Sequence, residues 1–401
     1  MVKSVLVSIA LIIFAFQNPL INLSGNFSFY DELTVIFICT LTLISFLIKK
    51  GDLIRKETFL VLILSLIYFF LGFVSNLLNK NQLLVYALLD AFTSLKFVFV
   101  LMSSRYLFRN FNVKEILKVL SSLAKVSACS LFVIDIFSLL TGFFPIYEYR
   151  YNLPAQQLFF AHPTFLVSSC VLLIGFLQAN LDNKKDYKYI HMLNFVIFST
   201  LRTKGFLFIF FFYLILIIVV ILRKRLKTSH LVSFSIIGVF FGLKLTYKTL
   251  FESDYSPRTL LTKYSFVVAK EYFPLGSGFG TYGSYVSAIK YSKIYRVFNF
   301  QNYYGLSPKN YSIITDTFWP MIIAQTGYAG LIVFVLILII LLRWIWQLQH
   351  RSLSIFLSAM ALMFYLLITS SSESSFANYY ATGFCLFIGL LLSSARETSN
   401  D

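Results

Sequence analysis

The segment Ser256-Pro257-Arg258 and the run Pro274-Leu-Gly-Ser-Gly-Phe-Gly280 lie in residues 248–315, the one long stretch of this chain that does not resemble a membrane span. On both sides of it the sequence consists mainly of apolar runs. Of the 401 residues, 58% are hydrophobic and only 13% are charged, whereas soluble domains carry roughly a quarter charged residues. We therefore predict an all-α polytopic integral membrane protein.

Most of the apolar runs are long enough to cross a hydrocarbon core of about 30 Å as a helix rising about 1.5 Å per residue. We expect about twelve transmembrane helices, near residues 4–22, 33–48, 58–77, 83–102, 119–141, 157–177, 188–201, 205–222, 231–247, 317–342, 353–370 and 376–394. They would form a single membrane domain over residues 1–401, interrupted by one long loop at about 248–315 with short amphipathic helices.

The formal net charge of +17 is distributed unevenly. Basic residues concentrate in alternate connections, such as 49–56, 105–118 and 223–227, while the connections between them hold few. Membrane proteins show this excess of Lys and Arg on the cytoplasmic side. The pattern predicts both termini in the cytoplasm and the long loop on the outer face. It also argues against nucleic acid as a partner, because the positive charge follows the membrane topology.

Two arginines are candidates for an anion site. The predicted span 188–201 is short for a crossing, so Arg202 should lie below the outer interface, where a charged guanidinium needs a partner. The simpler interpretation is that its side chain reaches the lipid headgroups. Arg258 follows Ser256, a good N-cap, and Pro257, a favoured first helical residue. A helix start carrying an arginine suits a phosphate, either of a substrate or of a lipid headgroup.

The glycines of the long loop do not form a nucleotide-binding motif. Gly276, Gly278 and Gly280 are followed by no Lys-Ser/Thr pair and preceded by no apolar strand, which excludes a P-loop and a dinucleotide fingerprint. They allow the chain to fold back over a substrate, or simply to turn. Tyr282 begins a series of aromatic residues. Tyrosines suit the faces of sugars, but they also line membrane interfaces.

Three segments together resemble a known family. They are Phe198-Ser-Thr-Leu-Arg-Thr-Lys-Gly205, residues 258–283, and Asp316-Thr-Phe-Trp-Pro-Met-Ile-Ile-Ala-Gln-Thr-Gly-Tyr-Ala-Gly330. In order, spacing and topology they are similar to the O-antigen ligase and Wzy-type polysaccharide polymerase superfamily. The topological resemblance covers nearly the whole chain, and the motifs cover about 188–331. The resemblance implies a membrane-embedded glycosyltransferase that uses an undecaprenyl-diphosphate-linked glycan as donor.

The resemblance implies roles for individual residues. Arg202 and Arg258 match the positions of arginines that clamp the donor diphosphate. Asp316 and Gln325 stand where the family often has a histidine and a glutamate. Because that histidine is missing, the resemblance favours a polymerase over a ligase to lipid A core. Asp316 is then a candidate general base, although an aspartate just before a helix is often only an N-cap.

A further group of polar residues precedes the sixth predicted span. Glu148 and Arg150 are followed by His162-Pro163, and a similar Arg then His-Pro arrangement recurs in Wzy-type polymerases. The resemblance implies a role on the acceptor side and makes His162 a second candidate base. The simpler interpretation is a structural histidine.

The expected function is polymerisation of a bacterial surface polysaccharide on the outer face of the cytoplasmic membrane. The expected partners are undecaprenyl-diphosphate-linked oligosaccharides as donor and acceptor, the lipid bilayer, and a chain-length regulator. We expect no cofactor and no metal, because no Asp-x-Asp or ligand cluster for Mg²⁺ stands in the predicted outer segments.

Two other functions remain open at this stage. An O-antigen or teichoic-type ligase would share the diphosphate clamp and differ in its acceptor. A transporter or flippase for an anionic lipid or metabolite would use intramembrane charges for coupling, and the chain offers Asp90, Lys96, Lys125 and Asp135. Against transport, the sequence shows no pair of repeats with broken helices.

Overall fold

The computed structural model describes residues 2–48, 56–181, 184–221 and 256–394. The span predicted near 231–247 and the beginning of the long loop lie outside these ranges. Within them the chain is helical apart from one short hairpin, β1 (Tyr149–Arg150) and β2 (Leu153–Pro154). The expected all-α class is therefore confirmed.

A helix occupies each apolar run that falls in the described residues. The helices are α1 (Val2–Ala15), α2 (Gln17–Leu23), α3 (Tyr30–Ile48), α4 (Lys56–Asn79), α5 (Leu84–Leu107), α6 (Val113–Thr141), α7 (Pro163–Ala179), α8 (Tyr187–Ser199), α9 (Thr203–Leu216), α14 (Phe318–Gln347), α15 (Leu353–Thr369) and α16 (Tyr379–Ser394). Among the described residues, five helical stretches are long and apolar enough to cross a membrane, or six if the bent pair α1–α2 is one span. A membrane protein is thus supported, and the count of twelve stays a prediction.

The first predicted span is broken. α1 and α2 meet at an angle of 76° around Phe16. Pro19 explains the break, because its ring would collide with the carbonyl of Ala15 in a continuous helix and it has no N–H to donate. The break leaves Asn18 buried, where its side-chain oxygen accepts a hydrogen bond of 2.8 Å from the N–H of Ala161.

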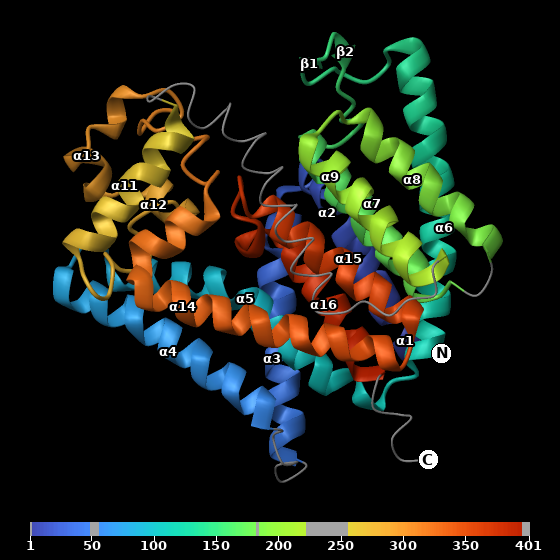
Figure 1. Cartoon of the computed structure of the whole chain (residues 1–401), viewed down its shortest axis with the longest axis horizontal. Helices are drawn as coiled ribbons and strands as arrows, with labels where there is room; N and C mark the ends of the chain where they lie inside the picture. Colours follow the sequence, from blue (N-terminus) through green and yellow to red (C-terminus); the bar gives the residue numbers. More distant parts are fainter. Residues whose placement is uncertain (1, 49–55, 182–183, 222–255, 395–401) are drawn as a thin grey trace.

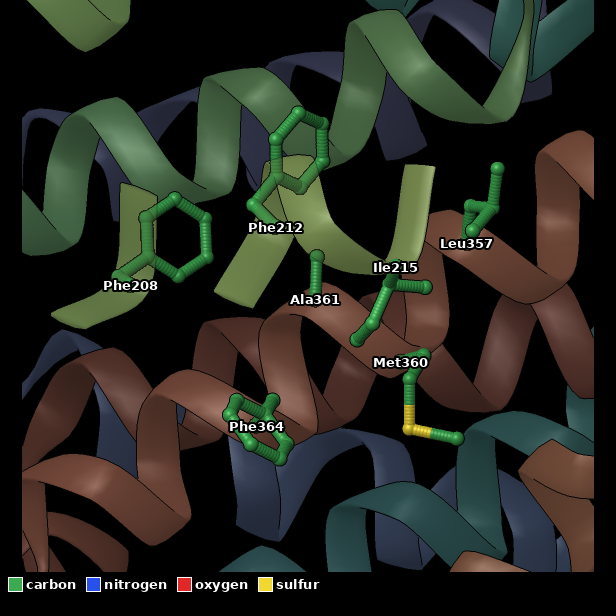
Figure 2. A pocket seen from close by; sticks show the side chains of 7 residues that line it. All are labelled: Phe208, Phe212, Ile215, Leu357, Met360, Ala361 and Phe364. Carbon is green, nitrogen blue, oxygen red and sulfur yellow. The ribbon is translucent and has the colours of Figure 1, made fainter. Parts of the chain in front are cut away.

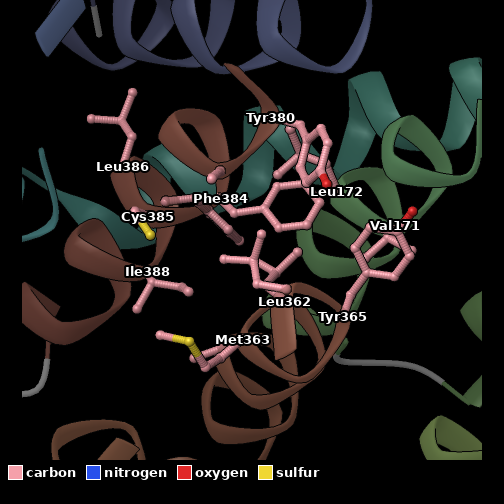
Figure 3. Close-up of a cluster of buried hydrophobic side chains, with 14 of the residues drawn as sticks. Val171, Leu172, Leu362, Met363, Tyr365, Tyr380, Phe384, Cys385, Leu386 and Ile388 are labelled. Carbon is pink, nitrogen blue, oxygen red and sulfur yellow. The ribbon is translucent and has the colours of Figure 1, made fainter. Parts of the chain in front are cut away.

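The helices pack as neighbouring pairs. α14 lies beside α4, α16 beside α5, and α15 beside both α7 and α9 (Figure 1). A small apolar cavity remains where Phe208, Phe212 and Ile215 of α9 face α15 (Figure 2). α7 and α16 are buried on nearly every side, so both lie inside the bundle. Figure 3 shows side chains of α7, α15 and α16 filling their shared interface.

Residues 256–317, which we call the outer segment after the membrane side expected from the sequence, form a separate small structure at one end of the bundle. It contains α11 (Pro257–Glu271), α12 (Tyr285–Ile289) and α13 (Lys293–Val297), drawn in yellow and orange in Figure 1. The expected cap is present, since the Ser256 hydroxyl accepts a hydrogen bond from the N–H of Thr259. Its own apolar cluster includes Leu261, Tyr282, Tyr295 and Phe300.

The glycine run fastens this segment to the membrane helices. α14 is interrupted at Gly327, where φ is 65° and ψ is −171°. The backbone of Gly276 lies directly against this break. A side chain on Gly276 would collide with the backbone at Gly327, and a side chain on Gly327 would collide with the backbone at Pro274. The N–H groups of Ser277 and Gly278 donate to the carbonyls of Ala324 and Gln325, both at 2.8 Å. The close approach explains why glycines stand here.

Candidate functional site

Most of the polar residues predicted between α6 and α9 come together in one group, which we call the Arg202 cluster. It consists of Tyr147, Glu148, Arg150, His162, Arg202, Lys204 and Glu373. They come from the hairpin, the starts of α7 and α9, and the connection between α15 and α16. Segments more than 200 residues apart in sequence therefore meet at this point, since Tyr147 and Glu373 bracket the group.

Arg202 lies at the centre of the cluster. It is the N-cap of α9, in the tight turn after α8, and its side chain is 14% exposed. One terminal nitrogen contacts Glu148 Oε1 at 3.0 Å, and the other lies 3.2 Å from Nε2 of His162. The guanidinium carbon is 5.2 Å from the ring centre of Tyr147. The guanidinium is therefore held by three groups and does not extend freely toward lipid.

The cluster carries an excess of positive charge. Glu148 is shared, because Arg150 Nε also contacts its Oε1 at 2.7 Å. Lys204 pairs with Glu373 at 2.6 Å. Three cations thus face two carboxylates, which leaves one positive charge uncompensated within the cluster. Partial burial strengthens the attraction of this charge for an anion, because water screens it less there than at an open surface.

His162 is neutral at pH 7. Burial, followed by the charges of Arg202, Lys204 and Arg150, lowers the pKa of the His162 imidazole from 6.5 to about 4. As the N-cap of α7, its Nδ1 accepts a hydrogen bond of 3.1 Å from the N–H of Thr164. A neutral imidazole has one acceptor nitrogen and one N–H. Both ring nitrogens face a donor, the N–H of Thr164 at Nδ1 and a terminal nitrogen of Arg202 at Nε2, so the neutral ring cannot satisfy both.

These donors converge without enough acceptors. Nε2 of His162 and a terminal nitrogen of Arg202 lie 3.2 Å apart. The Nε of Arg202 is buried and has no hydrogen-bond partner among the described residues. Buried donors normally find a partner, since an unsatisfied one costs about 1–3 kcal/mol. An oxyanion beside Arg202 would supply the acceptor that its Nε lacks.

Arg258 forms a second, more open site with Asp316. Arg258 stands in the first turn of α11, and its terminal nitrogen contacts Asp316 Oδ2 at 2.5 Å. The two side chains are 45% and 27% exposed. The N-cap of α14 is Thr317, whose side chain makes no capping hydrogen bond. Asp316 is therefore the counter-ion of Arg258 here, and the interpretation of it as an N-cap is wrong.

The connection between α15 and α16 touches both sites. Glu373 pairs with Lys204 of the Arg202 cluster. The next residue, Ser374, donates from its hydroxyl to the carbonyl of Thr315 at 2.9 Å and from its N–H to the same oxygen at 3.2 Å. Thr315 directly precedes Asp316. Both predicted arginines therefore lie at the same end of the bundle, joined by one short connection.

The other predicted residues lie apart from these charges. Gly276 and Gly278 are buried in the joint with α14, and Gly280 is buried against the start of α5. Tyr282 is fully buried in the core of the outer segment, and its hydroxyl donates to the carbonyl of Leu261 at 2.7 Å. Burial raises the pKa of Tyr282 well above its usual value. These four residues build the scaffold of the loop, and we do not include them in the site.

The apolar cavity between α9 and α15 is not a site of polar chemistry. It is lined by Phe208, Phe212, Ile215, Leu357, Met360, Ala361 and Phe364 (Figure 2). None of these side chains can donate a hydrogen bond, carry charge or transfer a proton. We therefore place the candidate site at the charged clusters.

The intramembrane charges expected of a transporter have local partners instead. Asp90 accepts from the N–H of Gly280 at 2.7 Å, Lys96 pairs with Asp31, Lys125 pairs with Asp186 at 2.9 Å, and Asp135 accepts from the hydroxyl of Ser199 at 3.0 Å. Asp90 thus holds the glycine loop, and Asp135 holds the end of α8 that precedes Arg202. From these contacts we interpret Asp90 and Asp135 as residues that position the neighbouring backbone.

Sequence reasoning did not find Glu373, Tyr147 or the pairing of Arg258 with Asp316. Glu373 had a recognisable signal, because it is the single acid in the serine-rich connection 370–375 between two apolar runs. Tyr147 had none, since its role depends on how the hairpin folds onto His162. The ring centres of Tyr147 and His162 are 4.6 Å apart and nearly perpendicular, at 76°.

The comparisons with known proteins add no assignment. A scan against models of protein families finds no match, and neither does a comparison with curated protein sequences. Within the described residues, no three His, Cys, Asp or Glu side chains are grouped so that they could hold a metal ion.

The low pKa of His162 leads to a testable pH dependence. We expect the His162 imidazole to titrate near its pKa of about 4 and not near 6.5. A bound anion would oppose the surrounding cations and raise this pKa. NMR signals of the His162 ring in the purified protein across about pH 4–8, assigned by comparison with His162→Gln, would test this. A midpoint near 6.5 without ligand would contradict it.

The same shift affects folding. Between 6.5 and about 4 the unfolded chain takes up a proton at this histidine while the folded chain does not. The low pKa of His162 therefore has no effect on the free energy of unfolding above pH 6.5. It lowers this free energy as pH falls, and the loss is complete below about pH 4. His162→Gln should remove this contribution to acid sensitivity.

Proposed function

We propose that this protein is a membrane-embedded glycosyltransferase that polymerises lipid-diphosphate-linked glycan units on the outer face of a bacterial cytoplasmic membrane. The observation that carries the proposal is the Arg202 cluster, in which three cations face two carboxylates and the Nε of the partly buried Arg202 has no hydrogen-bond partner among the described residues. A diphosphate oxygen provides the missing acceptor. Arg258 offers a second cation at the same end of the bundle, and the family resemblance described above suggests the same two arginines.

In the proposed reaction the anomeric carbon of the growing glycan breaks its bond to the diphosphate oxygen. A hydroxyl of the next lipid-linked unit forms the new glycosidic bond, and the lipid diphosphate leaves with the electron pair. Negative charge therefore develops on the diphosphate. Arg202 and Arg258 stabilise it by charge-assisted hydrogen bonds, a role in which preorganised donors contribute most. The protein supplies positioning and electrostatics, and it forms no covalent bond to the sugar.

The attacking hydroxyl must lose its proton to a base. Two residues compete for this role, and they differ in availability. His162 is neutral at pH 7, but its low pKa makes it a weak base until an anion neutralises the nearby cations. Asp316 is the salt-bridge partner of Arg258, and a diphosphate that binds Arg258 would displace it and free its carboxyl group. We propose Asp316 as the base and His162 as a donor to the diphosphate.

The proposal is tested by reconstitution. Purified full-length protein in nanodiscs should convert the lipid-linked repeat unit of its native cells into longer polymers without any added protein. Transfer to a lipid A or teichoic acceptor in place of the repeat unit would identify a ligase. Movement of the lipid-linked unit across a liposome membrane without chain extension would identify a flippase.

Topology gives an independent prediction. Cysteine at Ser312, an exposed position of the outer segment, should react with a membrane-impermeant maleimide in intact spheroplasts. Cysteine at Asn110, exposed between α5 and α6, should react only after permeabilisation, because that connection belongs to the basic side. The four native cysteines, Cys39, Cys129, Cys170 and Cys385, are free thiols that lie within helices, and their replacement by alanine gives the background. The reverse labelling pattern would overturn an outer-face reaction.

A further inference from the structure

The β1–β2 hairpin exposes a row of tyrosines beside the Arg202 cluster. Tyr147, Tyr149 and Tyr151 are spaced by two residues, with Tyr149 in β1 and Tyr151 in the turn that follows it. Tyr149 is 70% and Tyr151 74% exposed, although large aromatic rings are usually covered. In contrast, the tyrosines of the outer segment that sequence reasoning connected with sugars, such as Tyr282 and Tyr295, are fully buried.

The turn of this hairpin contains Tyr151, a residue type that does not favour the backbone conformation found there. Arg150 pairs with Leu153, so the turn consists of Tyr151 and Asn152, with φ values of 53° and 61°. Two positive φ values define the turn that favours Asn and Gly, and Asn152 fits this preference. A tyrosine at positive φ is uncommon and strained. The stability of the turn does not explain Tyr151, and local strain of this kind is frequent where a side chain serves function.

The tyrosine row is continuous with the anion site. Tyr147 lies edge-on to His162 at 4.6 Å, and the guanidinium of Arg202 lies 5.2 Å from its ring centre. The base of the hairpin is fastened to the Arg202 turn, because the N–H of Gln156 donates to the carbonyl of Ser199 at 3.1 Å. A ligand held at Arg202 therefore meets Tyr147 first, with Tyr149 and Tyr151 further along the hairpin.

We propose that Tyr149 and Tyr151 form a carbohydrate platform that binds the first sugars attached to the lipid diphosphate. Tyrosine combines an apolar ring face, which packs on the C–H face of a pyranose, with a hydroxyl that bonds to sugar hydroxyls. Glu148 and Arg150 alternate with the tyrosines along the chain. Their ion pairs connect the hairpin to Arg202. This inference rests on the proposed function, because the diphosphate at Arg202 places the sugars.

The Tyr151→Asn variant tests the role of the ring without weakening the turn. Asparagine suits positive φ, so this variant should keep or strengthen the hairpin while it removes the ring. The test measures equilibrium binding of full-length protein in nanodiscs to two probes, the lipid-linked repeat unit of the native cells and bare undecaprenyl diphosphate. Wild type should prefer the glycosylated probe. Tyr151→Asn and Tyr149→Ala should each weaken binding of that probe by about tenfold and leave the bare probe unchanged.

Two control variants sharpen the result. Phe143→Ala removes an equally exposed ring, 69% exposed, from the same connection outside the tyrosine row, and it should change neither affinity. Tyr151→Phe keeps the ring and should retain most of the preference. Equal loss on both probes, or no loss on either, in Tyr149→Ala and Tyr151→Asn would overturn the platform.

The experiment also separates this inference from the proposed function. If wild type binds the bare diphosphate but shows no preference for the glycosylated probe, the platform fails and the diphosphate site stands. If wild type does not bind the bare probe, the diphosphate site fails. A tyrosine row that serves as a membrane anchor would lie in lipid, so strong quenching of Tyr149→Trp fluorescence by brominated lipids would overturn the carbohydrate assignment.

Discussion

Arg202→Lys is expected to reduce chain extension by about 100-fold or more, the loss typical when one donor to a developing oxyanion is removed. The two terminal nitrogens of Arg202 contact Glu148 and His162 separately, at 3.0 and 3.2 Å. A lysine has one nitrogen and cannot reproduce this planar fork. The rate should be measured as polymer formed from lipid-linked repeat units by purified protein in nanodiscs.

Arg258 should respond less to the same change. Its side chain is 45% exposed, compared with 14% for Arg202, and it contacts Asp316 in an ion pair. Water screens an exposed charge, so a lysine at position 258 can replace much of its attraction for a diphosphate. We expect a smaller loss for Arg258→Lys, of about tenfold.

The control for both arginine variants is Arg296→Lys, an exposed arginine of α13 in the outer segment. It should change the rate by less than about twofold. Thermal unfolding of each variant would exclude a folding defect as the cause. Wild-type rates and polymer lengths in Arg202→Lys would contradict the diphosphate clamp, whichever result Arg258→Lys gives.

The helices were more predictable than their contacts. Each apolar run in the described ranges forms a helix, because a backbone in lipid must satisfy its own hydrogen bonds. The exception, the break near Phe16, follows from Pro19. The N-cap at Ser256 was also readable, because a cap depends on three neighbouring residues. These features are local, and local chemistry determines them.

The candidate site was only partly predictable for the opposite reason. Its key residues were named individually, but Lys204 and Glu373 are 169 positions apart, and Arg258 and Asp316 are 58 apart. No spacing rule connects such pairs, since the packing of other helices decides them. The tyrosines of the outer segment were assigned to sugars because composition alone cannot show that this segment needs its own core. The same composition left the exposed Tyr149 and Tyr151 unnoticed.

The role of Asp316 gives the second large effect. If Asp316 is the base, Asp316→Asn should lower chain extension by about 10²–10⁴-fold, the usual contribution of a general base. Binding of the lipid-linked donor should be retained or tightened, because the substitution removes the carboxylate that competes with a diphosphate for Arg258. Glu271→Gln, which removes an exposed acid at the end of α11, is the matched control and should leave both quantities unchanged.

The combination of rate and affinity distinguishes the two functions of this carboxylate. A base that is also a counter-ion shows a lower rate together with tighter donor binding. A counter-ion alone shows tighter binding at a full rate, and in that case the proton must go to His162, which the pH profile of the His162→Gln variant would then reveal. Because Asp316 contacts Arg258 at 2.5 Å in the absence of substrate, an arriving diphosphate must break this ion pair. Binding of the donor would thereby release the base only when there is a substrate to deprotonate.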